Sequence, residues 1–357
     1  MKIGTLTFHR ASNFGGALQC YALVTYLKKK GYDAEVVDYH SKAIEESYTL
    51  ISTIGLRNFL SSLRKFSYFY KLNKNFRKFR KLIPISKESY HSVNDLQDKY
   101  DVLLIGSDQV WSKRINKGFD PVFWGNVKGN IRVVSYAASM GTDHNYTSEE
   151  NELIKQYLSN FYAISVREDS LATELSRLTD TQIETVVDPT LLISLEDYYE
   201  IADASDLPFE KYVLFYQMEY DPQSTDRVEE IAEQLNCNIV IVGGPKRKFK
   251  LPSKHYRYSE IDVVKFLGLY KNATCVFSSS FHGTALSVAF QKDFYFFNIK
   301  AIDRAKYLLS HICALDRMIS PSEFVKFSPV DYNTILPKLE SFKKRSISFI
   351  NSVLSNE

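Results

Sequence analysis

Short, continuous apolar runs recur along this sequence, and they limit the possible folds more than any other feature. In the first half they cover 102–105, 132–136, 162–166 and 183–187, each between stretches with helical spacing. Runs of this length are typical of parallel strands that are covered on both faces. We therefore expect an α/β fold with doubly wound sheets.

The second half repeats this alternation. Strands are predicted at 212–216, 238–242, 274–277 and 294–297. An acidic, turn-rich segment at 201–210 separates the two halves, and we place the domain boundary near it. The expected architecture is two Rossmann-like, doubly wound domains at 1–200 and 208–330, followed by a C-terminal segment at 331–357. Ligands are expected at the carboxyl ends of the strands, in a cleft between the domains.

Composition excludes several classes of protein. Of the 357 residues, 45% are apolar and 24% are charged. These values exclude a disordered chain, a collagen-like repeat and a coiled coil. The net charge of +3 is too small to predict nucleic-acid binding. The amino terminus lacks a signal-peptide pattern, and no apolar run reaches the roughly 18 residues of a membrane-spanning helix, so we expect a cytoplasmic protein.

The four cysteines form no CxxC pair. They are Cys20, Cys237, Cys275 and Cys313. This spacing disfavours a structural zinc site. Each cysteine lies among apolar neighbours, so we expect buried, reduced thiols and no bound metal.

Residues 41–95 interrupt the first domain with a basic, aromatic-rich stretch. Between Ser47 and Lys87 there is no Asp or Glu, whereas ten Lys or Arg residues occur. Apolar residues recur there mostly at helical steps, which predicts an amphipathic helix or helical hairpin. Two interpretations stay open: a lid helix whose lysines face water, and a helix at 47–87 that lies on an anionic membrane. Nucleic acid is not expected as a partner, because no known binding motif accompanies the charge.

A further strand is predicted at 2–8, and the loop after it contains Asn13, Gly15 and Gly16. Glycines let backbone amides approach a ligand, and the next helix directs its positive end into the loop. The spacing matches neither the GxGxxG dinucleotide fingerprint nor a Walker loop. The loop is a candidate substrate contact, with a tight turn as the alternative.

Polar side chains also follow the strand at 102–105. Ser107, Asp108 and Gln109 supply a hydroxyl, a carboxylate and an amide, and Trp111 supplies an indole. Sugar hydroxyls need such partners, and a sugar ring packs against an aromatic face. The alternative is that Asp108 only caps a helix.

Arg167 and Glu168 end the strand at 162–166. A guanidinium at this position could hold a carboxylate or a phosphate in its planar fork. The alternative is an Arg–Glu pair that braces the sheet. Asp188 ends another strand, where Pro189 forces a turn.

The sequence Ser280-Phe281-His282-Gly283-Thr284 follows the strand at 274–277 and begins a helix. The hydroxyls and the amides of the first helical turn are suited to bind an anion. His282 is placed to donate or accept a proton there.

A basic loop precedes this site and runs from Lys246 and Arg247 to Arg257. It either attracts an anionic substrate or is a solvated loop.

At these residues the chain resembles the polysaccharide pyruvyltransferase family. The matching blocks are 2–9 with 13–15, 106–111, 165–170, 187–190 and 280–283. They follow one another in the family's order, and 304–317 also fits its last part. The resemblance covers most of the chain, from residue 1 to about 320.

The resemblance implies a fold like that of the two-domain GT-B glycosyltransferases, with the acceptor on the first domain and the donor on the second. It implies that a C-terminal helix at 335–354 packs back across the domains. It also implies transfer of pyruvyl from phosphoenolpyruvate onto two hydroxyls of one sugar, which forms a cyclic ketal and releases phosphate. No cofactor is expected besides this donor. The acceptor would be a cell-surface polysaccharide or a lipid-linked precursor at the inner face of the membrane.

The resemblance associates Arg167 and His282 with the donor site. Some relatives have Arg-Leu-His where this chain has Ser280-Phe281-His282, so one donor-binding cation is absent here. Candidates to replace it are Lys246, Arg247, Arg304 and Lys306. For the acid and base that the chemistry requires, we expect His282 in one role and Asp108 or Glu168 in the other.

Two other functions share the same architecture. One is a GT-B glycosyltransferase that uses a nucleotide sugar, with Glu260 or Asp262 as the ribose-binding carboxylate. The other is a binding protein of the same family that has lost its chemistry, for which Ser280 is the best support. Architecture alone does not separate these functions.

Overall fold

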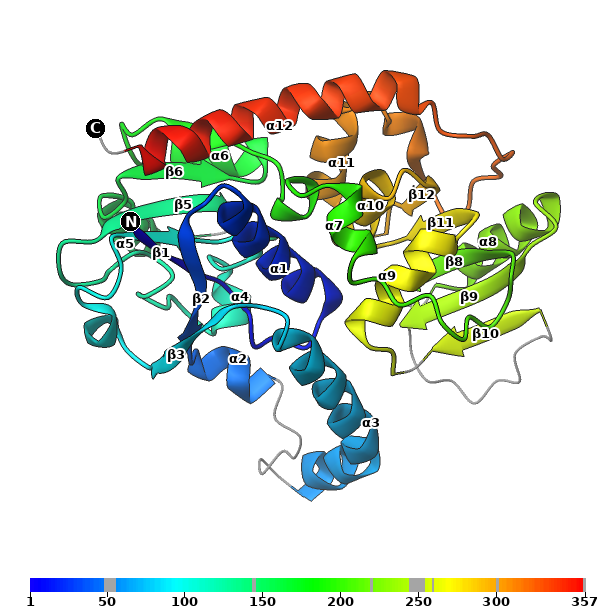
Figure 1. Cartoon of the computed structure of the whole chain (residues 1–357), viewed down its shortest axis with the longest axis horizontal. Coiled ribbons are helices and arrows are strands. Elements are labelled where there is room, and N and C mark those ends of the chain that lie inside the picture. Colours follow the sequence, from blue (N-terminus) through cyan, green and yellow to red (C-terminus); the bar gives the residue numbers. More distant parts are fainter. Residues whose placement is uncertain are drawn as a thin grey trace. The chain divides into compact units, whose positions relative to one another are not determined.

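The computed structural model describes residues 1–47, 56–142, 146–218, 221–243, 254–258, 260–299 and 302–355. The chain divides into two compact units, and each is built around a parallel sheet (Figure 1). Unit 1 comprises residues 1–193 and 341–357, and unit 2 comprises residues 194–340.

Unit 1 contains a seven-stranded sheet in the order β3-β2-β1-β4-β5-β6-β7, and its paired strands are parallel. The strands are β1 (Lys2–Leu6), β2 (Asp33–Tyr39), β3 (Ile85–Tyr90), β4 (Val102–Ile105), β5 (Arg132–Ala138), β6 (Ala163–Val166) and β7 (Ile183–Thr185). The order reverses between β1 and β4, which is where open α/β sheets bind ligands. The predicted doubly wound sheet is confirmed for this unit.

Helices follow most of these strands. The helices of unit 1 are α1 (Phe14–Lys29), α2 (Lys42–Ser47), α3 (Leu56–Arg80), α4 (Lys113–Asn116), α5 (Ser148–Leu158) and α6 (Asp169–Leu175), with 3-10 turns η1 (Val93–Leu96) and η2 (Pro189–Leu191). α1 begins where the Gly16 amide donates to the Asn13 side chain at 2.6 Å. Lys28 and Lys29 lie in its last turn, where cations face the negative end of the helix dipole. Gly31, at φ 87°, then turns the chain toward β2.

The basic stretch at 41–95 contains the predicted helix as α3, the short helix α2 precedes it, and residues 48–55 between them lie outside the described part. The structure also corrects the prediction, because Ile85–Tyr90 is strand β3, paired with β2 at the edge of the sheet. Only Ser86 and Tyr90 of this strand are buried. It therefore lacks the apolar run from which the other strands are predicted.

Unit 2 contains a six-stranded sheet in the order β10-β9-β8-β11-β12-β13, again with parallel pairing. The strands are β8 (Tyr212–Gln217), β9 (Asn238–Gly243), β10 (His255–Tyr258), β11 (Cys275–Ser278), β12 (Asp293–Phe297) and β13 (Met318–Ile319). The helices are α7 (Leu195–Tyr199), α8 (Pro222–Gln234), α9 (Val263–Asn272), α10 (Phe281–Ala289) and α11 (Ile302–His311), with the 3-10 turn η3 (Leu315–Arg317). The order reverses between β8 and β11, so unit 2 is also doubly wound.

The last helix, α12 (Tyr332–Leu354), contributes residues to both units. Its final part groups with unit 1, where the Val187 amide donates to Ser346 Oγ at 2.9 Å. The Arg132 guanidinium donates to the Val353 carbonyl at 2.9 Å. The division between the units falls after Ile193, which is earlier than the segment at 201–210 where the sequence places the boundary.

The structure corrects the expectation for one cysteine. Cys20, Cys237 and Cys275 are buried, but Cys313 is exposed. It lies just after α11 with φ 57°, in a turn at the surface. Within the described residues, no helix combines the length and the apolar character needed to cross a membrane.

Candidate active site

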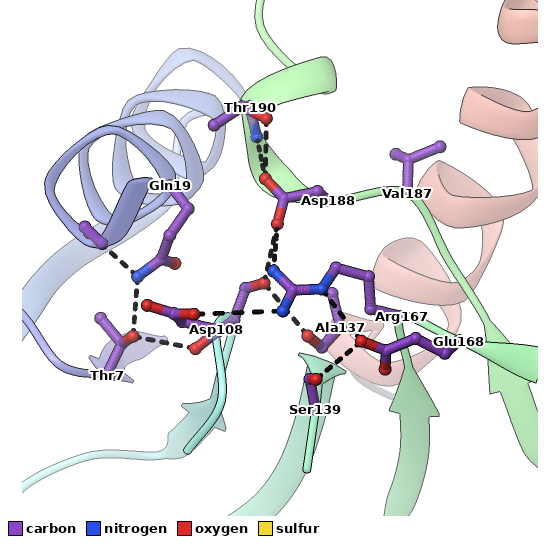
Figure 2. Close-up of polar contacts among 12 residues, drawn as sticks. Thr7, Gln19, Asp108, Ala137, Ser139, Arg167, Glu168, Val187, Asp188 and Thr190 are labelled. Carbon is purple, nitrogen blue, oxygen red and sulfur yellow. Dashed lines mark hydrogen bonds and ion pairs between the residues drawn. The ribbon is translucent and has the colours of Figure 1, made fainter. Parts of the chain in front are cut away.

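Arg167 lies at the carboxyl end of β6 and is surrounded by three carboxyl groups (Figure 2). Its Nη1 donates to Asp188 Oδ2 at 2.8 Å. Its Nε lies 3.5 Å from Glu168 Oε1, and its Nη2 lies 4.0 Å from Asp108 Oδ1. The residue is only 2% exposed. The structure therefore brings together three of the four residues predicted to be catalytic, and all three lie in unit 1.

The charge of Arg167 is balanced inside unit 1. Burial alone would lower the pKa of Arg167, but the carboxyl groups of Glu168, Asp188 and Asp108 outweigh it and raise this pKa. A buried cation with several carboxyl partners is costly to disrupt. This geometry agrees with the sheet-bracing alternative for Arg167, and its contact with the donor stays a prediction.

Hydroxyl groups orient the carboxyl groups around Arg167. Asp188 accepts from Ser107 Oγ at 3.2 Å and from Thr190 Oγ1 at 2.7 Å. Glu168 accepts from Ser139 Oγ at 2.7 Å. Ser107 Oγ also lies 3.0 Å from the Ala137 carbonyl, and its single proton is shared between that oxygen and Asp188. Ser107, predicted to bind substrate, thus connects the ends of β4 and β5 instead.

Asp108 has a backbone conformation that side chains rarely adopt. Its φ is 71°, and it follows a cis peptide between Gly106 and Ser107. The alternative that it caps a helix is wrong, because Ser112 caps α4 and accepts from the Ile115 amide at 3.2 Å. Asp108 is buried beside Arg167, at the carboxyl edge of the unit 1 sheet.

Trp111 belongs to the core of unit 1, which corrects its predicted role as a platform for a sugar. Its ring stacks on Trp124 with centroids 4.8 Å apart and meets the edge of Phe161 at 5.7 Å. Its Nε1 donates to the Phe123 carbonyl at 2.8 Å, and the residue is fully buried. Gln109, two residues earlier, is half-buried.

The loop with Asn13 mainly starts a helix. The Gly16 amide, which was expected to reach a ligand, donates to the Asn13 cap, and both Gly15 and Gly16 are buried. A Cβ on Gly16 would lie 3.0 Å from Asn13 Oδ1, so glycine fits the cap closely. This geometry agrees with the tight-turn alternative.

In unit 2, His282 lies in the first turn of α10, directly after β11, and is 8% exposed. Ser280 caps the helix and accepts from the Gly283 amide at 3.4 Å. Thr284 donates its hydroxyl to the Ser280 carbonyl at 3.2 Å. The hydroxyls of Ser280 and Thr284 therefore stabilise the helix start, and His282 projects a titratable ring from the same turn.

Gly283 is required by packing at the end of β11. A Cβ there would overlap Ser278 Oγ and would lie 2.8 Å from Tyr216 Cδ1. The Gly283 carbonyl accepts from Tyr270 OH at 3.1 Å and from Ser287 Oγ at 2.9 Å. These contacts hold the amino end of α10 against the carboxyl ends of β8 and β11.

Two further residues lie at this edge: Arg257, which the sequence places in the basic loop, and Gln217, which the sequence did not indicate. Arg257, on β10, donates to the Gly243 carbonyl at 2.6 Å and to Gln217 Oε1 at 3.3 Å. Gln217 ends β8 and is fully buried, and in the described structure its Nε2 has no hydrogen-bond partner. Arg257 belongs to the basic stretch that begins at Lys246, for which the sequence predicts a loop, whereas the structure places Arg257 on strand β10.

The other candidate cations are placed as follows. Lys246 and Arg247 lie outside the described residues. The Arg304 guanidinium lies over the Phe281 ring, 5.8 Å from its centroid. Among the described residues, no group of three or more His, Cys, Asp or Glu is arranged to hold a metal ion.

The carboxyl edge of the unit 2 sheet can therefore bind an anion. The positive end of the α10 dipole, the guanidinium of Arg257 and the amide of Gln217 all belong to this edge. β8 and β11 pair here with Tyr216 opposite Ser278, so the elements carrying Gln217 and His282 are neighbours. An imidazole at an anion site can transfer a proton to or from the bound group.

Comparisons with known proteins agree with this architecture. The family model described as polysaccharide pyruvyl transferase matches residues 13–300. No curated protein matches the sequence.

Among solved structures, the chain is similar to the UDP-GlcNAc 2-epimerase from Methanocaldococcus jannaschii, with 12% identity, a TM-score of 0.53, and coverage of 99% of this chain and 100% of that one. The complex of that organism's UDP-GlcNAc 2-epimerase with UDP-GlcNAc and UDP gives a TM-score of 0.51, with the same identity and coverage. At this identity the likeness shows the fold, and it confirms the predicted GT-B-like pair of Rossmann-like domains.

Proposed function

Because the chain belongs to the polysaccharide pyruvyl transferase family, we propose that it transfers pyruvyl from phosphoenolpyruvate onto two hydroxyls of one sugar. The product is a cyclic ketal on a polysaccharide or on a lipid-linked glycan precursor. The observation that carries the proposal is the arrangement at the carboxyl edge of unit 2, where His282 stands in the first turn of α10 and Arg257 contacts Gln217.

The donor's charge fits this edge. Phosphoenolpyruvate carries about three negative charges on a compact frame, so its site needs cations and aligned amides. Arg257 supplies a guanidinium, and the buried Gln217 supplies an amide donor. We assign Arg257 as the cation that takes the place of the arginine absent at Ser280. Arg257 is favoured because it contacts Gln217 at this edge, whereas the Arg304 guanidinium lies over the Phe281 ring, and Lys246 and Arg247 lie outside the described part.

The reaction balances without a cofactor. A proton adds to C3 of the enol, and the resulting positive charge at C2 is attacked by the first sugar hydroxyl, which loses its proton. The bond between C2 and the phosphate oxygen then breaks, and the second hydroxyl attacks C2 and loses its proton. One hydroxyl proton replaces the proton given to C3, and the other leaves with inorganic phosphate.

We assign His282 as the acid that protonates C3, because it is the titratable side chain in the first turn of α10. An acid or base in this role contributes about 10²–10⁴-fold to the rate. For the base that accepts the hydroxyl proton, Asp108 is favoured over Glu168. Glu168 accepts from Ser139 and lies closer to Arg167, whereas Asp108 Oδ1 is 4.0 Å from that guanidinium. Arg167 is then a positioning residue.

A nucleotide-sugar glycosyltransferase is the second candidate, and the epimerase fold likeness is what favours it. The epimerase from M. jannaschii was solved with UDP-GlcNAc and UDP. In this chain, however, Asp262 caps α9 and accepts from the Lys265 amide at 2.8 Å. One of the two candidate ribose-binding carboxylates is therefore already engaged in a helix cap. Glu260 is left for that role.

Thermal unfolding with each ligand separates the two functions. A ligand at 100 times its Kd stabilises a fold by about 2.7 kcal/mol, so the true donor should raise Tm clearly. We expect phosphoenolpyruvate to raise Tm and UDP-GlcNAc to leave it unchanged. A shift with UDP-GlcNAc alone would replace this proposal with the glycosyltransferase.

A further inference from the structure

Helix α3 is held to unit 1 by one face of its carboxyl-terminal half. Phe76 and Phe79 are buried there, and their rings pack against α1. The Phe14 and Phe76 centroids lie 5.3 Å apart, and the Tyr21 and Phe79 centroids lie 5.8 Å apart. From this contact α3 projects away from the sheet (Figure 1).

The other face of α3 is exposed to solvent, and we call it the basic face. It consists of Phe66, Tyr70, Lys71, Lys74, Arg77, Lys78 and the adjoining Lys81. Residues spaced by three or four along a helix lie on one side of it, so these side chains form a continuous surface. The segment itself adds no negative charge, because no acidic residue occurs between 47 and 87.

Two aromatic side chains extend the basic face toward the amino end of α3. Phe66 is 38% exposed and Tyr70 is 53% exposed. Their rings stack on each other, with centroids 6.0 Å apart and an angle of 19° between planes. Large aromatic side chains next to cations on a projecting helix are what an interfacial membrane helix presents to lipid headgroups and acyl chains.

We propose that the basic face of α3 docks this protein on an anionic lipid bilayer. Cations would contact the headgroups, and Phe66 with Tyr70 would enter the interfacial region. An anionic bilayer matches both the cations and the exposed rings of the basic face. An acidic protein surface matches only the cations. A nucleic acid is less well matched, because the two rings already stack on each other and leave fewer faces for bases. The proposal does not depend on the identity of the pyruvyl donor or on the reaction proposed above.

Vesicle co-sedimentation of the full chain tests the proposal. The vesicles are phosphatidylcholine alone and phosphatidylcholine mixed with phosphatidylglycerol. We expect binding only to the mixed vesicles, and we expect it to weaken at 1 M salt, where the Debye length falls to about 3 Å. Absence of binding to mixed vesicles at low salt overturns the proposal, and so does equal binding to both kinds of vesicle.

A matched pair of triple variants locates the surface. Lys71→Glu, Lys74→Glu and Arg77→Glu reverse three charges on the basic face. The control reverses the same residue types at exposed sites elsewhere in unit 1, namely Lys128→Glu, Lys155→Glu and Arg177→Glu. Both variants have the same net charge. We expect the first to lose about tenfold or more of its binding and the control to keep it, with equal Tm values. Equal loss in both variants overturns the proposal.

Two further measurements test the aromatic contact and the competing partner. Phe66→Ser with Tyr70→Ser should weaken vesicle binding severalfold and leave its salt dependence unchanged. A duplex or single-stranded oligonucleotide should not displace the protein from the vesicles. Unchanged vesicle binding after removal of both rings overturns the proposed interfacial contact, and tight, face-dependent oligonucleotide binding would assign the surface to nucleic acid.

Discussion

Arg167 Nη1 donates to Asp188 Oδ2 at 2.8 Å, and this buried pair joins the end of β6 to the turn at η2. Glu168 and Asp108 complete the surroundings of the guanidinium. The arrangement makes Arg167 a support for the carboxyl edge of unit 1. We therefore expect loss of the Arg167 side chain to lower the stability of the fold.

Replacing Arg167 with Met should lower the free energy of unfolding by about 3–5 kcal/mol, because it leaves buried carboxyl groups without their cation. Urea denaturation measures the change. Arg177→Met, at an exposed position of the same unit, is the control and should change it little. Adding Asp188→Asn to the Arg167→Met chain should restore part of the lost free energy of unfolding. A well-folded Arg167→Met protein with unchanged stability that fails to bind phosphoenolpyruvate would return Arg167 to the donor site.

Stability should depend on pH through His9. Burial lowers the pKa of His9, although its hydrogen bond to Asp38 at 2.8 Å opposes the shift. The unfolded chain, with a His pKa of about 6.5, then binds the proton more readily than the folded chain. Stability should therefore fall as pH drops below about 6.5. Asp38 is not the cause in this range, because its pKa is depressed and its contribution is lost only below the pKa of an unfolded Asp, about 3.9.

Urea denaturation at several pH values between about 8 and 5 measures this dependence. His9→Gln keeps a donor near Asp38 but does not titrate, so its stability should vary less over the same range. If the variant and the parent chain lose stability in parallel, another group is responsible.

The environment of Trp111 predicts the intrinsic fluorescence. The chain has two tryptophans, and both Trp111 and Trp124 are fully buried in unit 1. Emission should be blue-shifted and resistant to acrylamide. Sugars should not alter it, since neither ring offers an open face. Strong quenching by acrylamide that a glycan relieves would show that Trp111 contacts the acceptor.

Arg257 should contribute directly to donor affinity. A hydrogen bond to a charged group contributes about 1.5–3 kcal/mol, so Arg257→Met should weaken phosphoenolpyruvate binding by about 10- to 100-fold. Calorimetric titration gives the Kd. Arg227→Met removes a guanidinium of the same unit that pairs with Glu230 on α8, and it should leave Kd unchanged. An unaltered Kd in Arg257→Met would exclude this arginine from the donor site.

Most strands that the sequence predicted are rich in buried apolar side chains, although no residue of Ile183–Thr185 is fully buried. Val102–Ile105 is buried at every position, and such a run can be recognised without tertiary information. Ile85–Tyr90 and His255–Tyr258 are edge strands with polar or basic residues, so nothing local distinguishes them from loops. Because the second of these strands was not predicted, Arg257 could be placed only in a basic loop and not on the sheet.

The site was harder to predict than the fold, because burial decides what a side chain does. Trp111 follows a strand end as a sugar-binding residue would, yet Trp124 covers its ring. Arg167 occupies a position suited to an anion, yet Asp108 and Asp188 from distant segments join the neighbouring Glu168 around it. Local motifs do not show such partners. His282 was recognisable because strand, helix start and imidazole are contiguous in the sequence.

The central claim is tested most directly by phosphate release from phosphoenolpyruvate in the presence of a pool of lipid-linked and polysaccharide acceptors. The parent chain should release phosphate, and His282→Ala should lower kcat by about 10²–10⁴-fold while phosphoenolpyruvate still binds. His311→Ala, on α11 of the same unit, should behave like the parent chain. Near-normal turnover in His282→Ala would remove this residue from the mechanism. Tight donor binding by the parent chain with no phosphate released from any acceptor would contradict the assigned transfer itself.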